Sequence, residues 1–369
     1  MDTTIRGLRV VWSAVLGAAV VSAVAAAANA QPAGAGAAAP KVAPRDRNAA
    51  LEYMTLHEQM DKDMSALVSE EWRPNDADWV PSEKLSLMLE DNQRLVRRIM
   101  EASRLPTYDM QLRYEEGFSL VVPHLGHIRQ FTRVLVTDAR RLALAGRGEE
   151  AVERLTAVLR MSRHVIDDRI LISSLVAVAV VSASHKQAEH LATEGLLGDR
   201  GRREYIRAAK ALLTDDPFGV ARCLAVERTM ARQTIQPFVE GKGNLAGKEL
   251  AAQLRRLQLS GEGVKAVSGM MEEEAQAQVD LMDRYYAALL AAWGKSDTPT
   301  RLADLDKRLQ AGDFGVLMKE IGPALSRAHV SVERAINETR AIIALLVAAG
   351  EPAPEEDDEH AEQDHTGEQ

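Results

Sequence analysis

The sequence predicts an all-α fold, an irregular array of antiparallel helical hairpins around a buried central helix. Aromatic residues make up only 4% of the 369 residues and hydrophobic residues 46%, a balance that favours helix over sheet. No segment alternates apolar and polar residues between turn signals, as a strand does. The segment 169–191, RILISSLVAVAVVSASHKQAEHL, is apolar on nearly every side over 170–183. Such a helix must be buried all round, and its apolar run is shorter than the roughly 20 residues that span a bilayer.

Residues 1–30 have the pattern of an export signal. Two arginines precede an apolar stretch over 10–28, and the tripeptide ANA at 28–30 matches the small-residue cleavage site of a signal peptide. We therefore expect a periplasmic or secreted protein, in which residues 31–46 form a flexible linker of Ala, Gly and Pro. The alternative is an uncleaved membrane anchor, because the apolar stretch is about as long as a bilayer span. We expect membrane association only in that case.

Charge is distributed unevenly along the chain. The formal net charge is −9, and removal of the signal leaves −10. Nine of these charges lie in the tail 351–369, which has no Lys or Arg and is expected to be disordered. The near-neutral body gives no electrostatic reason to expect nucleic-acid binding. The single cysteine, Cys223, cannot form an internal disulfide, so the core must supply the stability of an exported chain.

One all-α domain is expected over 47–350, and its first two helices are bounded by prolines. Apolar residues recur at helical spacing from about residue 47 to Trp72, before Pro74 stops the pattern. The second helix starts at Pro81 and closes at Leu105. Their methionines are expected to fill gaps in the core, with a Met-rich groove for a partner helix as the alternative. These methionines are Met54, Met60, Met64, Met88 and Met100.

A helical hairpin and the central helix follow. Pro123 suits the first turn of a helix that ends at the sequence AGRG, residues 145–148. Its partner helix is expected over 149–165. Asp167 and Asp168 then offer caps for the central helix.

Beyond Gly198 the same periodicity predicts six more helices. Asp216 is the expected cap of the second of them and Pro217 its first-turn residue, and 241–247 is expected to be a loop. The six helices are expected over 203–213, 217–236, 248–259, 264–293, 301–310 and 321–349.

The segment 142–161, LALAGRGEEAVERLTAVLRM, resembles one tetratricopeptide unit. It has a small-residue helix, a glycine, and then Glu-Ala on a second helix. The spacing predicts that the two helices cross closely at Gly146 and Ala151. No second copy follows at a period of about 34 residues, so a regular solenoid is not supported.

A longer pattern runs through the whole predicted domain. It consists of YDMQLRYEEG (108–117), PHL (123–125), the hairpin, LISSLVAVAV (171–180) and IGPALSRA (321–328). In this order and spacing it resembles an uncharacterised exported all-helical family of planctomycete bacteria, over about 48–350. This chain has Met110 where that family has Trp, and an acidic tail where the family often continues with another helix. The family has no assigned activity, so the resemblance implies an exported helical fold alone.

The irregular segment 107–122 gathers the first candidate ligand-binding residues. Aromatics and charged residues on an irregular segment of a helical scaffold are where binding residues tend to lie. Its acids and tyrosine are candidates for an acid/base cluster. The alternative is structural, because adjacent carboxylates on a helix point to different sides and Arg113 and Arg129 can neutralise them. The candidates are Asp109, Tyr114, Glu115 and Glu116.

His124 and His127 are the candidate metal ligands. They stand three residues apart at a helix start and so share a face, and Glu115 or Glu116 would complete a metal site. The alternative is a packed, hydrogen-bonded histidine, because His124 shares its stripe with core residues. No phosphate-binding loop, dinucleotide fingerprint, H-E-x-x-H or nucleophile elbow occurs.

Two functions follow as hypotheses. The first is an exported helical scaffold or interaction module of the cell envelope, without catalytic activity or cofactor, that binds an envelope protein or peptide. The second is a metal-dependent hydrolase or metal-binding protein that uses the Glu115 and His124 region. A filler protein with no specific ligand is a third reading that the sequence does not separate from the first.

Overall fold

The computed structural model describes residues 47–322 and 325–350, and over these residues the protein is all-α. The one extended pairing there is a single bridge between Asn48 and Thr107. The predicted fold class is therefore confirmed. The predicted signal peptide, linker and acidic tail lie outside the described residues.

Four short helices form the N-terminal part, where the sequence predicts two longer ones. Asn48, Asp61 and Ser82 each accept a backbone N–H of the following first turn at 2.9–3.1 Å. Such caps satisfy N–H groups that a helix start leaves unpaired, so Asp61 begins a new helix inside the predicted one. Asn92 ends the third helix by donating its amide to a carbonyl one turn earlier, at 2.8 Å. The helices are α2 (Ala49–Glu58), α3 (Lys62–Glu70), α4 (Glu83–Asp91) and α5 (Gln93–Ser103).

Methionines of these four helices fill the core as predicted. Met60, Met64 and Met100 are buried. Met54 and Met88 are half-buried, and Met88 packs against the core from its edge.

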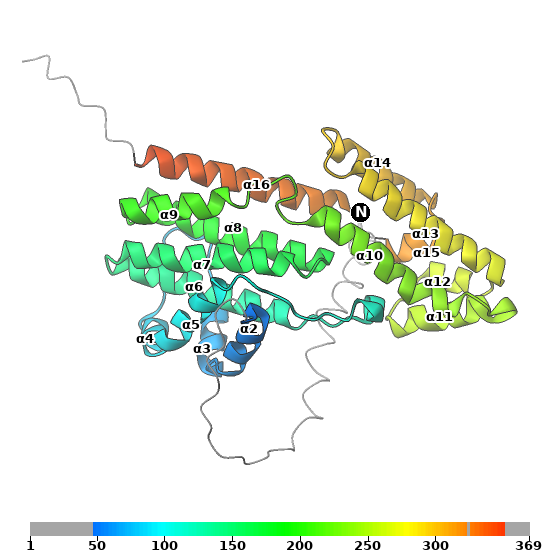
Figure 1. The fold of residues 1–369 in the computed structure, drawn as a ribbon, viewed down its shortest axis with the longest axis horizontal. Coiled ribbons are helices and arrows are strands. Elements are labelled where there is room, and N and C mark those ends of the chain that lie inside the picture. Colours follow the sequence, from blue (N-terminus) through cyan, green and yellow to red (C-terminus); the bar gives the residue numbers. More distant parts are fainter. Residues whose placement is uncertain (1–46, 323–324, 351–369) are drawn as a thin grey trace, which may run out of the picture.

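The centre of the molecule is a helical hairpin packed on the long apolar helix. The hairpin consists of α6 (His124–Leu144) and α7 (Gly148–Ile166), and α8 (Leu171–Thr193) packs against both. Two helices from the C-terminal half, α10 (Val220–Ile235) and α16 (Leu325–Ala348), also contact α8. Figure 1 shows α16 running back along α8, so that the two ends of the described chain belong to one helical array.

Burial within the protein accounts for the apolar character of α8. It is the one helix of the described residues that is long and apolar enough to cross a membrane, judged by length and composition alone. However, 67% of its most apolar stretch is buried inside the protein, and Ala177 and Val181 are fully enclosed. The predicted central helix is therefore confirmed.

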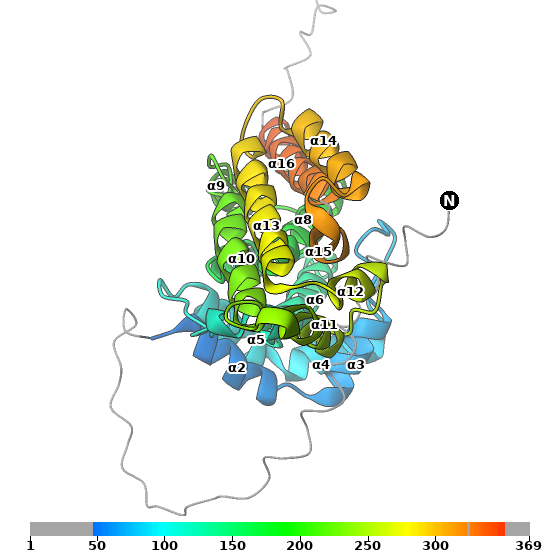
Figure 2. The same ribbon diagram turned by 90° about the vertical axis from the view of Figure 1, so that its right-hand side faces the viewer.

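The remaining helices form a second group at one end of the array. Figure 2 shows α10 to α15 on the near side, with α2 to α5 below them. Gly219 and not Asp216 occupies the N-cap position of α10, but the Asp216 carboxylate still stabilises the helix start, since it accepts the N–H groups of Val220 and Ala221 at 2.9 and 3.2 Å. Pro217 lies before the helix and not in its first turn. The elements of this group after α10 are η3 (Gln236–Phe238), η4 (Gly243–Leu245), α11 (Ala246–Arg256), α12 (Glu262–Val267), α13 (Glu272–Ala292), α14 (Thr298–Ala311) and α15 (Gly315–Ile321). The helix α9 (Asp199–Lys210) lies at the opposite end, where it packs against α7 and α16 (Figure 1).

One of the six helices predicted here is divided in the structure, and another starts later than predicted. The prediction over 264–293 covers both α12 and α13, whose break lies at 268–271. The prediction over 321–349 corresponds to α16, which starts at Leu325, and the short helix α15, which ends at Ile321, was not predicted. The predicted loop over 241–247 holds η4 and the first turn of α11. Boundaries of this kind are set by tertiary packing more than by apolar periodicity.

The predicted helix crossing at Gly146 is wrong. Gly146 has φ +74°, the left-handed region that favours glycine, and an added Cβ there would meet no heavy atom within 4 Å. The close approach lies two residues later, where a Cβ on Gly148 would clash with the carbonyl oxygen of Leu196. Gly146 therefore ends α6, and Gly148 lets the chain after α8 pass directly over the start of α7.

A buried ionic cluster ties α5 to the hairpin. Asp138 on α6 is fully buried. Its Oδ1 accepts the Gln93 amide at 3.1 Å and two N–H groups of Arg141 at 2.8 and 3.0 Å. Its Oδ2 accepts Nε of Arg154 at 3.1 Å, and the Arg154 side chain is 5% exposed. A single carboxylate thus joins α5, α6 and α7.

Candidate functional site

The irregular segment before α6 is held tightly against α10, and this fixes where its side chains point. A short 3-10 helix, η2 (Tyr114–Ser119), packs on α10. Gly117 has φ +58°, and a Cβ there would clash with Thr234 Oγ1. That hydroxyl accepts the N–H of Phe118 at 2.8 Å. The glycine therefore allows the contact that seats this segment on the helical scaffold.

Tyr114 and His124 meet at Asp168, which the sequence predicts to be a helix cap. Tyr114 Oη donates to the carbonyl oxygen of Asp168 at 2.8 Å. His124 Nε2 lies 2.8 Å from Asp168 Oδ2, and Ser173 Oγ donates to the same oxygen at 2.9 Å. The side chains of His124 and Asp168 are 3% and 1% exposed. The result is a buried His–Asp–Ser cluster in which the carboxylate, and not the histidine, is the central group.

The capping role predicted for Asp167 and Asp168 is wrong. Residue Ile170 occupies the N-cap position of α8 and gives no side-chain hydrogen bond. The N–H of Leu171 is instead bound by the Glu227 carboxylate from α10, at 2.9 Å. Because Glu227 accepts the N–H group at the start of α8, the Asp168 side chain is not needed as a cap and can bind His124.

Three polar atoms at the cluster make no hydrogen bond of ordinary geometry with a described residue: Asp168 Oδ1, His124 Nδ1 and Tyr108 Oη. The Tyr108 hydroxyl nevertheless lies close enough to the Asp168 carboxylate to interact with it. Burial, followed by the charge of Asp168, raises the pKa of Tyr108. Orphaned buried atoms of this kind mark a polar site where packing is incomplete. None of these residues lines the groove or the cleft described below, so the cluster is enclosed by the protein.

The acidic candidates do not join this cluster. Glu115 is exposed, and Glu116 forms an ion pair with Arg113, its neighbour in the same turn. Asp109 accepts the backbone N–H of Gln111 at 2.7 Å and so stabilises a local turn. The segment thus brings Tyr114 to Asp168 and directs its carboxylates elsewhere.

The second candidate metal ligand also faces away from the first. The ring of His127 stacks on His57 from α2, with centroids 3.6 Å apart and planes 13° apart. Burial, followed by the charge of His57, lowers the pKa of His127 to about 4. Across residues 47–322 and 325–350, no group of three or more His, Cys, Asp or Glu side chains is placed to hold a metal ion. The shared helix face that the spacing predicts therefore serves two separate contacts.

A groove lies between α6 and α16, with α8 as its floor. Its volume is about 850 Å³. Ala179 is exposed in the floor although most of α8 is enclosed, so one stripe of the central helix is open to the outside. The lining includes Trp72 at one end, Arg129, Thr132 and Arg133 of α6, Ala179, Ser182, Ala183 and Lys186 of α8, and Glu338, Ile342 and Leu345 of α16.

Positive charge is concentrated on the α6 wall of this groove. Arg129 is exposed and makes no hydrogen bond or ion pair with any described residue. Arg133 donates only to neutral groups, the Ser69 hydroxyl at 3.2 Å and the Gln130 amide at 3.1 Å. Burial and the nearby charge of Arg129 lower the pKa of Arg133. On the other walls, Lys186 is paired with Glu189 at 2.9 Å, and Glu338 accepts the Ser182 hydroxyl at 2.6 Å.

His185, at the edge of the groove, links three helices. Its Nδ1 lies 2.9 Å from Tyr205 Oη of α9, and its Nε2 lies 2.9 Å from Thr339 Oγ1 of α16. The side chain is buried, and this burial lowers the pKa of His185 to about 4. The neutral ring satisfies both contacts, with one nitrogen donating and the other accepting.

We expect His185 to make the protein sensitive to acid. Its pKa is about 4 in the folded state and 6.5 in the unfolded state, so the unfolded chain binds the proton more readily. Stability is therefore full above pH 6.5 and falls as the pH drops toward 4, by about 2–3 kcal/mol from this group at pH 4.5. Urea unfolding of the wild type and His185→Gln at pH 7 and pH 4.5 measures the difference.

For each protein, the quantity compared is the change in the free energy of unfolding between pH 7 and pH 4.5. Hydrogen bonds lost by His185→Gln are lost at both pH values and cancel in that difference. We expect the variant to lose about 2–3 kcal/mol less than the wild type on acidification. Equal losses in the two proteins would show that His185 is not the group responsible.

Comparison with models of known protein families, with curated proteins and with solved structures finds no match to this chain. The resemblance over 48–350 and the tetratricopeptide-like unit therefore stay predictions. The described residues thus contain an enclosed polar cluster at Asp168 and an open groove along α8, and of the two the groove is accessible to another molecule.

Proposed function

We propose that the protein is an exported, non-enzymatic interaction module of the cell envelope. In this proposal, its groove between α6 and α16 binds a helical segment of another envelope protein. The observation that carries the proposal is the groove itself: about 850 Å³, with apolar side chains on its floor and one wall and unpaired arginine on the other.

The size of the groove suits a short polypeptide segment. Its lining on α8 extends from Ala179 to Glu189, about 15 Å at the rise of a helix. That length corresponds to about three helical turns of a ligand lying alongside. The small side chains of Ala179 and Ala183 leave space for a second helix to approach α8 closely, as helix packing at 8–10 Å requires.

The charge of the groove indicates the chemistry of the ligand. Arg129 has no ion pair, and Arg133 contacts only neutral partners. A segment with carboxylates along one edge would pair with both, while its apolar face covers Ile342 and Leu345 of α16. Apolar anchors supply the affinity of such helix-in-groove complexes, and the charges set orientation and specificity.

The metal-dependent alternative is not part of this proposal. His124 is bound to Asp168, and His127 is stacked on His57. Glu115 and Glu116 lie apart from both histidines in their contacts. No specific observation favours a reacting centre at these residues.

Site-specific crosslinking in native envelope fractions tests the groove. A photoreactive amino acid at Leu345, in the groove, is compared with the same residue at Val330, which is exposed on α16 outside the groove lining. We expect one specific crosslinked protein from position 345 and none from position 330. Ala183→Trp, which fills the floor, should reduce that product by about tenfold or more.

Charge reversal provides the matched control. Arg129→Glu with Arg133→Glu should abolish the crosslink, whereas Arg255→Glu with Arg256→Glu, two exposed arginines of α11, should leave it unchanged. A product that survives both Ala183→Trp and the reversal at the groove would overturn the proposal. So would equal products from positions 345 and 330.

A further inference from the structure

Exposed arginines without ion pairs gather at one end of the array. Arg200, Arg203 and Arg207 are exposed on α9, at spacings of three and four residues that place them on one stripe. Arg97 and Arg104 of α5 are exposed as well. None of these five side chains has a hydrogen bond or ion pair with any residue in 47–322 or 325–350. We call these five residues the arginine face.

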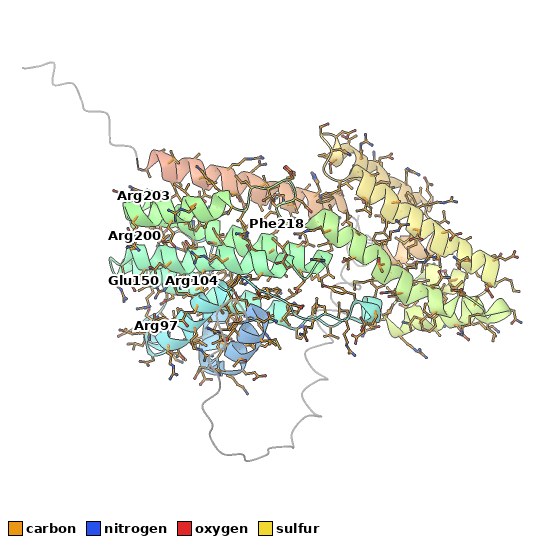
Figure 3. The ribbon with its side chains drawn as sticks, in the orientation of Figure 1. Arg97, Arg104, Glu150, Arg200, Arg203 and Phe218 are labelled. Carbon is orange, nitrogen blue, oxygen red and sulfur yellow. The ribbon has the colours of Figure 1, made fainter. Side chains whose placement is uncertain are left out.

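The two halves of the arginine face belong to neighbouring elements. Figure 3 shows Arg97, Arg104, Arg200 and Arg203 at the same end of the molecule. Arg160 of α7 lies between them, since it pairs with Glu204 of α9 at 3.4 Å. Burial and the charge of Arg104 both lower the pKa of Arg160. Like charges of α5 and α7 are therefore close enough to repel one another, next to Glu204 of α9.

Acidic residues near the arginine face already form ion pairs or lie among other arginines. Asp199 is bound to Arg202, and Glu150 holds Arg147 through two bonds of 2.6 and 2.7 Å. Glu101 and Glu153 line a cleft of about 310 Å³ between α5 and α7, together with Arg97, Arg104, Arg147 and Arg154. The five arginines thus remain as excess positive charge in a body that is near neutral as a whole.

The chain itself supplies a negative segment at this place. The C-terminal end of α16 packs against α9 (Figure 1). A side-chain carbon added to Gly350 would lie 3.8 Å from Nε of Arg202 on α9. The sequence continues from Gly350 into residues 351–369, which hold nine carboxylates and no Lys or Arg. Nineteen residues extend up to about 60 Å, several times the length of α9, which is about 18 Å, so the arginines of α9 are within reach.

We propose that the acidic tail, residues 351–369, folds back and docks on the arginine face of its own chain. The charges are complementary, and the attachment point lies beside α9. The tether holds the tail at an effective concentration on the order of millimolar, which a free polyanion must exceed to displace it. The contact is a set of exposed ion pairs, so added salt weakens it. The docked tail shields the arginines from other anionic partners.

Distance measurement in the full-length mature chain tests the docking. Donor and acceptor dyes are placed at Lys210→Cys, exposed at the end of α9, and at Gln363→Cys in the tail. Cys223 is buried, and burial raises the pKa of its thiol to about 12, so it does not compete for the label. We expect efficient energy transfer at about 20 mM salt and at least a twofold fall at about 500 mM, where the Debye length is near 4 Å.

Matched variants separate docking on this face from general compaction. Arg200→Gln, Arg203→Gln and Arg207→Gln together should remove the salt-dependent transfer, and circular dichroism should stay unchanged because these side chains have no partners to lose. Arg255→Gln with Arg256→Gln on α11 should retain it. Transfer that is low at low salt, or equally high in the triple variant, would overturn the proposal.

A second measurement distinguishes the tail from an external anion. A fluorescent oligoglutamate is titrated into the wild type and into a variant with all nine tail carboxylates changed to Gln or Asn. We expect the tracer to bind the variant at least threefold more tightly, because the face is then open. Equal binding to the two proteins would show that the tail does not occupy the arginine face.

Discussion

Asp138→Ala is expected to lower the free energy of unfolding by about 3–5 kcal/mol, the usual cost of removing one partner from a buried ion pair. The substitution leaves the guanidinium of Arg154, 5% exposed, without its bond to Oδ2. Arg154 keeps hydrogen bonds to the Gln93 amide oxygen at 3.1 Å and the Glu150 carbonyl at 3.3 Å. The carboxylates of Glu153 and Glu150 lie 3.8 and 4.0 Å away and are 39% and 41% exposed, so they compensate only weakly for the buried carboxylate. Urea unfolding followed by circular dichroism measures the loss.

A carboxylate bound by two more exposed arginines provides the control. Asp283 binds Arg228 at 2.9 Å and Arg232 at 3.0 Å, and these arginines are 41% and 54% exposed. Asp283→Ala should therefore cost only about 0–1 kcal/mol. Asp138→Ala combined with Arg154→Met should recover part of the loss, because it removes the unpaired charge as well. Similar values for Asp138→Ala and Asp283→Ala would contradict the assignment of Asp138 as a buried junction.

The sequence predicts the centre of the fold better than its edges. α8 has a long continuous apolar run and the hairpin before it has strong helical periodicity, and the structure follows both patterns closely. Helix breaks at Asp61, Asn92 and 268–271 were not predictable in this way, because a polar side chain on the exposed face does not disturb the apolar period. There, a side-chain cap or a tertiary contact decides where a helix stops.

The candidate site was predictable in part, and the limit has a physical cause. Polar residues around 107–127 indicate a site, and two of them, Tyr114 and His124, do converge. Their common partner is Asp168, whose position before a helix makes capping the ordinary interpretation. The unpaired N–H group at the start of α8 is bound by Glu227, a carboxylate far away in sequence. No local sequence pattern shows that Glu227, and not Asp168, has this role.

The groove has a still weaker signal in the sequence. Its walls come from residues between Trp72 and Leu345, so only the folded chain brings them together. The one local indication is the pair of small residues Ala179 and Ala183 on the central helix. A helix that is apolar all round predicts complete enclosure, and the open stripe departs from that expectation where α6 and α16 stand apart.

His124→Ala is expected to cost about 3 kcal/mol, because it leaves a buried carboxylate with a single donor. Asp168 Oδ2 would keep only the hydroxyl of Ser173, and Oδ1 makes no hydrogen bond of ordinary geometry even in the wild type. His127→Ala is the matched control, three residues along the same helix. It removes a stacking contact with His57 and no hydrogen bond, so we expect a loss of about 1 kcal/mol or less.

A double-mutant cycle then identifies the cause of the loss. Asp168→Asn replaces the charge with a neutral amide of similar shape, so His124→Ala should cost less in that background than in the wild type. We expect a coupling of about 1–3 kcal/mol between the two positions. Coupling near zero would mean that His124 stabilises the protein by packing alone. Crosslinking from Leu345 should persist in folded His124→Ala, since the Asp168 cluster supports the scaffold and the groove contacts the ligand.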